Sequence, residues 1–175
     1  MGKKILISAG HSTVPPKDPG AVSGKYVEAQ LALRMRDMVA DRLRAKGFTV
    51  IEDGADGVSE PLRKAIALCP QADTRVEFHF NAGPPTATGV EVLSLPKYKA
   101  LSQKIAGAVA QATGQKLRGD KGWKNQDSGQ HHRLGFCMAG GVIVELAFIS
   151  NAADMQRYLQ AETAVADRIA EALAT

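Results

Sequence analysis

Short apolar runs rich in β-branched residues alternate with segments of helical periodicity along almost the whole chain. The runs that predict strands cover residues 3–9, 48–51, 76–80, 89–95 and 141–148. The segments that predict helices cover residues 26–46, 59–69, 97–113 and 152–175. Strands that alternate with helices predict an α/β fold on a largely parallel sheet. At a length of 175 residues, we expect one domain that covers residues 1–175.

Two of the predicted helices begin with capping signals. Ser59 stands two residues before Pro61, and this order predicts a helix with Ser59 as its N-cap. Asn151 precedes the last helix, with Asp154 in its first turn.

Composition excludes several classes of protein. A hydrophobic content of 45% and a net charge of +4 exclude a disordered chain. Cys69 and Cys137 stand in apolar surroundings, which favours two buried side chains over a disulfide or a nucleophile. The longest apolar run, residues 136–144, is too short to span a membrane.

The beginning of the chain has a positive flank followed by a short apolar run at residues 5–9. A secretory signal needs an apolar region of about 7–15 residues. We therefore expect that the chain is made in the cytoplasm and carries no export signal of its own.

Basic residues are concentrated in one part of the chain. Residues 97–133 contain eight basic and two acidic side chains, and residues 114–135 lack any period, which predicts a long functional loop. A basic loop suits a polyanionic or carboxylate-bearing partner, or it is only a solvated surface. Trp123 in this loop is either a sugar-stacking or lid residue, or a core anchor for the loop. His131 and His132 either steady an oxyanion or are exposed loop residues.

Four polar side chains stand at or near the ends of predicted strands, where α/β folds place their sites. His11 follows the first strand, His79 ends the central strand, and Glu28 opens the first long helix. Glu145 interrupts the apolar run Val-Ile-Val-Glu-Leu-Ala-Phe. Burying a carboxylate there is costly unless the carboxylate is paired or lies beside a metal, so Glu145 is a candidate functional residue.

Two imidazoles and one carboxylate form the usual ligand set of a catalytic zinc. His11, Glu28 and His79 supply such a set, and Glu145 supplies a further carboxylate that can move a proton. The spacing between these residues contains no compact metal-binding motif. Spacing alone therefore indicates the zinc site only weakly.

Four stretches of the chain resemble one known family: residues 7–11, residues 18–21 with Glu28, residues 78–82 with residues 89–91, and residues 144–151. The sequence is similar to the zinc-dependent N-acetylmuramoyl-L-alanine amidases, which cleave peptidoglycan and include bacterial autolysins and phage endolysins. The resemblance implies a twisted sheet of about six strands flanked by helices. It also implies one zinc ion per chain on His11, Glu28 and His79, with Glu145 as the catalytic glutamate.

The resemblance further implies the substrate, peptidoglycan, and the bond, the amide between N-acetylmuramic acid and L-alanine. Candidate substrate contacts are Asn81, Trp123, His132 and Arg133. The chain departs from the family pattern at residues 12–17, which lengthen the first loop, and at Cys137-Met138, where Leu-Arg is expected. The chain shows neither the blocking helix nor the wall-binding repeats of bacterial members. We therefore expect a monomeric, phage endolysin-like catalytic domain that reaches the wall after the membrane is breached.

Two alternatives remain at this point. A zinc peptidase that acts on the stem peptide would use the same type of metal site, although the H-E-x-x-H motif is missing. The basic segment would also suit a non-catalytic module that binds cell wall or nucleic acid. Nucleic-acid binding is disfavoured because Trp123 is the only aromatic residue in the basic loop.

Overall fold

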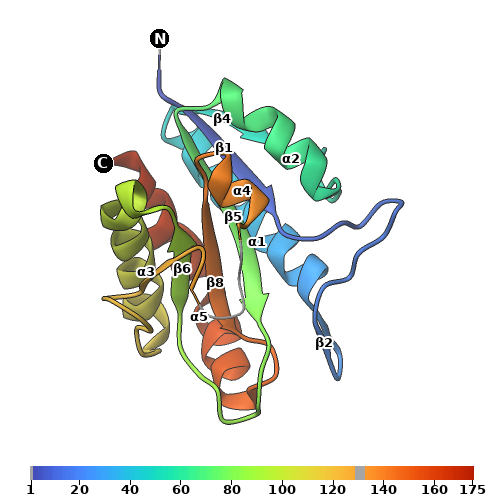
Figure 1. The fold of residues 1–175 in the computed structure, drawn as a ribbon, viewed down its shortest axis with the longest axis vertical. Coiled ribbons are helices and arrows are strands. Elements are labelled where there is room, and N and C mark those ends of the chain that lie inside the picture. Colours follow the sequence, from blue (N-terminus) through green and yellow to red (C-terminus); the bar gives the residue numbers. More distant parts are fainter. Residues whose placement is uncertain (1, 129–132) are drawn as a thin grey trace.

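A six-stranded sheet forms the centre of the computed structural model, which describes residues 2–128 and 133–175. In spatial order (Figure 1) the strands are β4 (Thr49–Glu52), β1 (Lys4–Ala9), β5 (Thr74–Asn81), β8 (Val142–Phe148), β6 (Glu91–Ser94) and β7 (Trp123–Asn125). Neighbouring strands are parallel except β6 and β8, which are antiparallel. The predicted α/β fold and its sheet of about six strands are confirmed.

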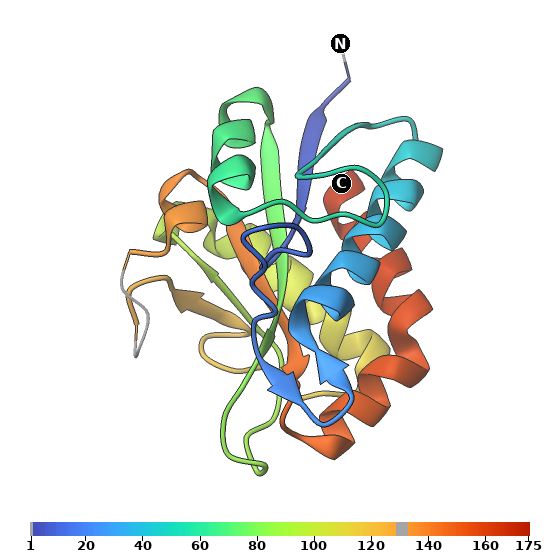
Figure 2. The same ribbon diagram turned by 90° about the vertical axis from the view of Figure 1, so that its right-hand side faces the viewer.

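Helices cover both faces of the sheet (Figure 2). The long helices α1 (Glu28–Ala45), α3 (Lys99–Thr113) and α5 (Ala152–Ala174) pack on one face, and the short helices α2 (Leu62–Leu68) and α4 (Gly135–Met138) on the other. Alternate strand residues serve the two layers: Val142 and Val144 join the core of the long helices, whereas Ile143 joins the core of the short ones. Burial on both faces explains why β8 is apolar at every position except Glu145.

The region expected to be one long loop contains two further elements. Trp123–Asn125 forms β7, which pairs in parallel with β6, and α4 begins at Gly135. The prediction of a continuous loop over residues 114–135 was wrong here. A polar three-residue strand at the edge of a sheet has no detectable alternation, and a four-residue helix has no detectable period.

The predicted start of the second helix was also wrong. Helix α2 begins at Leu62 with Pro61 in the N-cap position, and Ser59 is fully buried. The Thr13 N–H donates to Ser59 Oγ (3.2 Å), and the Ser59 N–H donates to Thr13 Oγ1 (3.0 Å). Ser59 therefore ties the loop before α2 to the loop after β1 instead of capping a helix.

Other local expectations are confirmed. Asn151 caps α5, because its Oδ1 accepts hydrogen bonds from the N–H groups of Ala153 and Asp154. Cys69 and Cys137 are buried and unpaired. Within residues 2–128 and 133–175, no helix combines the length and the apolar character that crossing a membrane requires.

A small antiparallel hairpin, β2 (Val22–Ser23) and β3 (Tyr26–Val27), leads directly into α1. It places Glu28 at the first position of that helix, next to His11 in the loop that follows β1. Strands β1, β5 and β8 lie next to one another and run parallel, so their carboxyl ends meet at one edge of the sheet. The candidate site lies at this edge.

Candidate metal centre and active site

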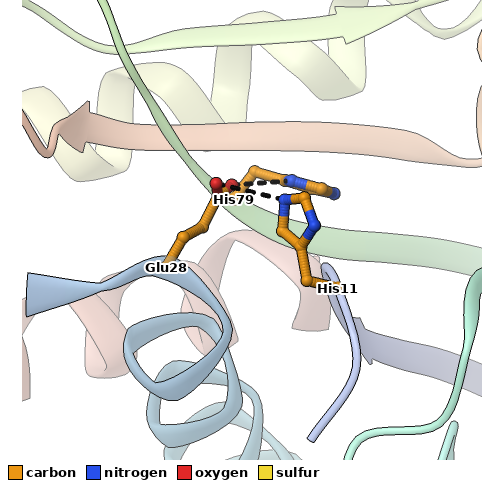
Figure 3. A group of neighbouring side chains, drawn as sticks. All are labelled: His11, Glu28 and His79. Carbon is orange, nitrogen blue, oxygen red and sulfur yellow. Dashed lines mark hydrogen bonds and ion pairs between the residues drawn. The ribbon is translucent and has the colours of Figure 1, made fainter. Parts of the chain in front are cut away.

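His11, Glu28 and His79 come together from three separate elements (Figure 3). One potential ligand atom from each residue lies within 4.8 Å of those of the other two. Glu28 lies between the two imidazoles, with Oε2 3.1 Å from His11 Nε2 and Oε1 2.9 Å from His79 Nδ1. The three residues singled out from the sequence as zinc ligands therefore share one site.

Backbone contacts fix the carboxylate of Glu28. The Ala21 N–H donates to Oε2 (2.8 Å), and the Phe80 N–H donates to Oε1 (3.0 Å). Burial by itself would raise the pKa of Glu28, but hydrogen bonds from His11 and His79 outweigh burial and hold that pKa far below its usual range. Glu28 is thus a preformed anion at the centre of the site.

The two imidazoles respond to the same negative charge. Burial would lower the pKa of His79, but its hydrogen bonds to Glu28 and Glu77 raise that pKa well above the usual value. The pKa of His11 is also raised, because its contacts with Glu28 and Asp18 outweigh burial. The site therefore favours positive charge, and a divalent cation held by two nitrogens and a carboxylate fits this donor set.

Two glycines and one unusual backbone conformation make room for this cluster. A Cβ atom on Gly10 would lie 2.3 Å from the His79 ring, and one on Gly20 would lie 2.5 Å from the His11 ring. His11 itself has φ of +68°, a left-handed conformation that non-glycine residues adopt mainly where function requires it. Close packing around the three side chains is thus built into the backbone.

Glu145 lies beside the cluster on β8, in register with His79 on β5. It is 8% exposed, and its Oε2 has no hydrogen-bond partner among the described residues. Burial raises the pKa of Glu145 to about 7, although the charge of His79 opposes this effect. A buried carboxylate oxygen without a partner requires an explanation, and its position next to the cluster makes Glu145 a candidate for proton transfer.

Two cavities are lined by both imidazoles. One, of about 250 Å³, is lined by both histidines together with Glu28, Asn81, Leu134 and Glu145, among other residues. The other, of about 320 Å³, is mainly apolar and includes Pro61, Leu62, Leu134, Phe136 and Ile143 in its lining. The arrangement leaves room for a substrate beside the cluster of His11, Glu28 and His79.

The candidate substrate contacts are distributed unevenly. Asn81 lines the smaller cavity, where its Nδ2 donates to Glu91 Oε1 (2.9 Å). Arg133 is exposed and precedes Leu134, which lines both cavities. His131 and His132 lie outside the described residues. Trp123 lines neither of the two cavities, and its indole N–H donates to Ser94 Oγ (3.0 Å), so its observed contact is an anchor on the sheet.

Part of the positive charge of residues 97–133 is neutralised by ion pairs within the fold. Arg118 and Lys124 both form ion pairs with the buried Glu91, and Lys99 forms an ion pair with Asp120. These side chains are therefore not all available to an anionic partner.

Two acidic residues at the site were not predicted from the sequence. Asp18 Oδ2 lies 2.9 Å from His11 Nδ1, and Glu77 Oε1 lies 3.1 Å from His79 Nε2. A weak signal for Glu77 was available, because residues two apart on a strand share a face. Neither contact follows from the sequence without the orientation of the imidazole ring.

Comparison with known proteins identifies the family. The model of the N-acetylmuramoyl-L-alanine amidases matches residues 5–175. The chain belongs to this family. The expectation drawn from the four sequence stretches is confirmed, and the chain is a peptidoglycan amidase, a hydrolase.

Individual amidases of the family show how far the likeness extends. A solved structure of a candidate N-acetylmuramoyl-L-alanine amidase from Neisseria meningitidis is 45% identical, with 98% of this chain and 94% of that chain covered and a TM-score of 0.89. LytC, an N-acetylmuramoyl-L-alanine amidase of Bacillus subtilis, is 26% identical over 169 residues, which are 92% of this chain and 32% of LytC. The catalytic domain of the amidase CwlV from Bacillus (Paenibacillus) polymyxa is 23% identical, with a TM-score of 0.82. The match covers 98% of this chain and 96% of that domain, and it shows that the two share a fold.

Proposed function

We propose that this amidase is zinc-dependent and cuts the amide bond between N-acetylmuramic acid and the L-alanine of the stem peptide. His11, Glu28 and His79 would hold the zinc, and Glu145 would be the catalytic carboxylate. One observation carries the proposal: the three ligand atoms lie within 4.8 Å of one another, beside a buried carboxylate whose Oε2 has no partner in the described structure.

The three residues suit zinc in number and chemistry, since catalytic zinc sites use three protein ligands. Zinc bound there would polarise the scissile carbonyl and make water more acidic. Glu28 contributes the anionic ligand, held in place by the N–H groups of Ala21 and Phe80. Potential ligand atoms of the three side chains already lie within 4.8 Å of one another.

Glu145 would carry the proton of the hydrolysis. The reaction adds water across the amide: the C–N bond breaks, the hydroxyl group joins the lactyl carbonyl carbon, and a proton joins the L-alanine nitrogen. With a pKa of about 7, the Glu145 carboxylate accepts a proton from the attacking water and releases it to the departing amine near neutral pH.

We further propose that residues 1–175 act as a single monomeric catalytic domain with the role of a phage endolysin, made in the cytoplasm and active on the wall. Asn81 would contact the substrate from the smaller cavity. His132 and Arg133 would do so from the basic segment, whereas Trp123 would anchor that segment on the sheet through Ser94. Light scattering on the purified chain tests the monomer. Coexpression with a membrane-permeabilising protein tests the endolysin role, because lysis is expected only when both are present.

A digest of purified peptidoglycan tests the reaction. Mass spectrometry of the products is expected to show stem peptides with a free N-terminal L-alanine, and a chelator is expected to abolish them. Fragments that keep the lactyl–alanine bond intact would contradict the amidase reaction and favour a stem-peptide peptidase. Metal analysis of the same preparation is expected to give one zinc per chain.

A further inference from the structure

Each imidazole of the candidate metal site has a second carboxylate on its outer nitrogen. Asp18 Oδ2 lies 2.9 Å from His11 Nδ1, and Glu77 Oε1 lies 3.1 Å from His79 Nε2. The two acids differ in their surroundings, since the side chain of Asp18 is 61% exposed and that of Glu77 only 3%. Asp18 is part of a surface loop, whereas Glu77 belongs to the interior of the sheet.

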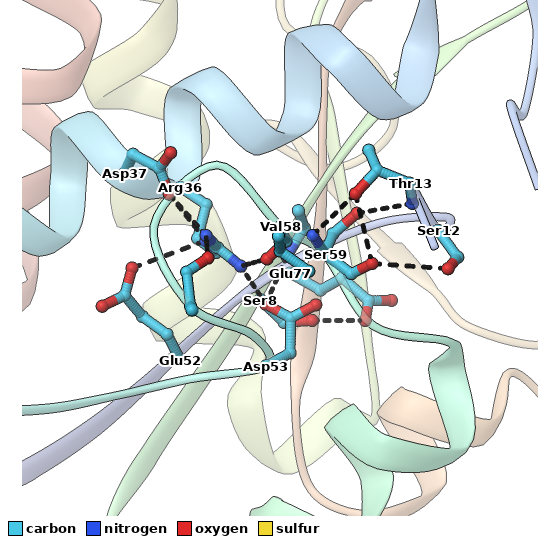
Figure 4. Close-up of polar contacts among 12 residues, drawn as sticks. Ser8, Ser12, Thr13, Arg36, Asp37, Glu52, Asp53, Val58, Ser59 and Glu77 are labelled. Carbon is cyan, nitrogen blue, oxygen red and sulfur yellow. Dashed lines mark hydrogen bonds and ion pairs between the residues drawn. The ribbon is translucent and has the colours of Figure 1, made fainter. Parts of the chain in front are cut away.

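The sheet holds Glu77 in a fixed position. Glu77 lies on β5 two residues before His79, so both side chains point to the same face of the strand. Ser8 on the adjacent strand β1 is in register with Glu77, and its Oγ donates to Glu77 Oε2 (3.0 Å; Figure 4). One carboxylate oxygen is thus held by Ser8 and the other faces His79.

A purely structural role explains this carboxylate poorly. Among the described residues no lysine or arginine lies within ion-pair distance of Glu77, and His79 is its only basic neighbour at that distance. Burying a carboxylate against only a hydroxyl group and an imidazole is costly. A neutral side chain would fill the same space at lower cost, so the negative charge must act on His79.

The contact with Glu77 determines which nitrogen of His79 faces the candidate metal site. Both ring nitrogens face a carboxylate, Nε2 that of Glu77 at 3.1 Å and Nδ1 that of Glu28 at 2.9 Å, and a carboxylate accepts hydrogen bonds from both. A metal ion held by Glu28 and His79 would take the place of the proton on Nδ1, and Glu77 would keep the proton on Nε2. At His11 the arrangement is reversed, because Asp18 takes Nδ1 and leaves Nε2 for the site.

We infer that Glu77 is a positioning residue, which keeps the proton of His79 on Nε2 and thereby makes Nδ1 a metal ligand. The inference rests on the proposed zinc site. In general, outer carboxylates orient the histidine ligands of metals and strengthen them as donors, and their loss weakens metal affinity about 10- to 100-fold. Glu77 would act through His79 without touching substrate.

Two variants of Glu77 and one matched control test this role. Glu77→Gln keeps the shape and one acceptor oxygen, and Glu77→Ala removes the acceptor. Glu162→Gln is the control, because Glu162 also accepts hydrogen bonds from two side chains, Arg34 and Tyr158, but lies on α5. Circular dichroism first establishes that each full-length variant is folded.

Zinc affinity, measured by competition with a chromophoric chelator, is the first readout. We expect about 10-fold weaker binding for Glu77→Gln, about 100-fold weaker binding for Glu77→Ala, and unchanged binding for Glu162→Gln. The second readout is the ¹⁵N–¹H spectrum of the histidine rings in the zinc-loaded protein. Wild type is expected to show a slowly exchanging proton on His79 Nε2, and Glu77→Ala a rapidly exchanging one.

The outcomes separate the inference from the proposed function. A wild type that binds zinc, together with folded Glu77 variants of unchanged affinity, would overturn the role of Glu77 alone. A proton found on His79 Nδ1 in the zinc-loaded wild type would do the same. A wild type that binds no zinc would overturn the proposed function and the inference with it.

Discussion

Glu145 has the most unusual environment of any carboxylate at the site, since it is buried and its Oε2 has no hydrogen-bond partner among the described residues. If it acts as the general base, it must be deprotonated to accept a proton, and its pKa is about 7. We therefore expect kcat/KM for peptidoglycan hydrolysis to rise with pH through about 7. Glu145→Gln should lower kcat by about 10²- to 10⁴-fold and keep the zinc. A rate that is independent of pH between 5 and 9 in the wild type would contradict this assignment.

The site requires a glycine at position 10, because the His79 ring occupies the space of a side chain there. A Cβ atom there would lie 2.3 Å from the His79 ring, so Gly10→Ala must displace that imidazole. We expect weaker zinc binding, measured by chelator competition. Gly107→Ala is the matched control, because a Cβ atom at this position on α3 meets nothing within 4 Å and should stabilise the helix by about 0.5–1 kcal/mol. Equal zinc affinity in the two variants would argue against close packing around His79.

Candidate site residues could be predicted from the sequence where a polar side chain interrupts an apolar run or stands at the end of a predicted element. Glu145 stands out within an apolar run, and His11, Glu28 and His79 lie near the ends of predicted elements. The roles of Asp18 and Glu77 were not predictable, because an acidic residue beside a histidine in space depends on strand register and ring orientation. In the same way, the contact of Trp123 with Ser94 depends on the pairing of two short strands.

Elements with a long apolar period were predictable, and short polar elements were not. Helices α3 and α5 and strands β1 and β8 were placed within a few residues, because burial on one or both faces imposes a pattern on their sequences. Strand β7 has three residues at the sheet edge, and the β2–β3 hairpin has two-residue strands. Such elements depend on tertiary contacts that leave no period in the sequence.

Arg36 joins α1 to the segment that follows β4. Its guanidinium is fully buried, donates to Asp53 Oδ1 (3.0 Å) and the Val58 carbonyl (2.7 Å), and also pairs with Asp37 (Figure 4). Arg36→Met would leave the buried Asp53 carboxylate without its ion-pair partner and with only the Ala9 N–H as a donor (3.2 Å), so we expect a loss of about 3–5 kcal/mol in the free energy of unfolding.

Denaturant titration measures the effect of Arg36→Met, and Arg34→Met is its control. Arg34 stands on the same helix and pairs with Glu162, but its side chain is 50% exposed. An exposed ion pair contributes at most about 1 kcal/mol. Similar losses in the two variants would mean that the buried network does not stabilise the fold more than a surface pair.

At the scale of the whole molecule, the site joins parts of the chain that are distant in sequence. Its ligands come from the loop after β1, the start of α1 and the end of β5, and Glu145 comes from β8. The three strands are neighbours in the sheet, so unfolding of the sheet separates the ligands. The proposed metal binding would therefore be thermodynamically coupled to folding.

This coupling predicts that zinc raises the unfolding temperature of the whole domain. Zinc that binds only the folded state at 100 times its Kd stabilises that state by about 2.7 kcal/mol. We expect a single unfolding transition in calorimetry that shifts upward with zinc and returns with chelator. The shift should be larger at pH 8 than at pH 6, because protons compete for imidazoles whose pKa values are raised in the metal-free state. His79→Ala is expected to remove the shift, and an equal shift in that variant would place the zinc elsewhere.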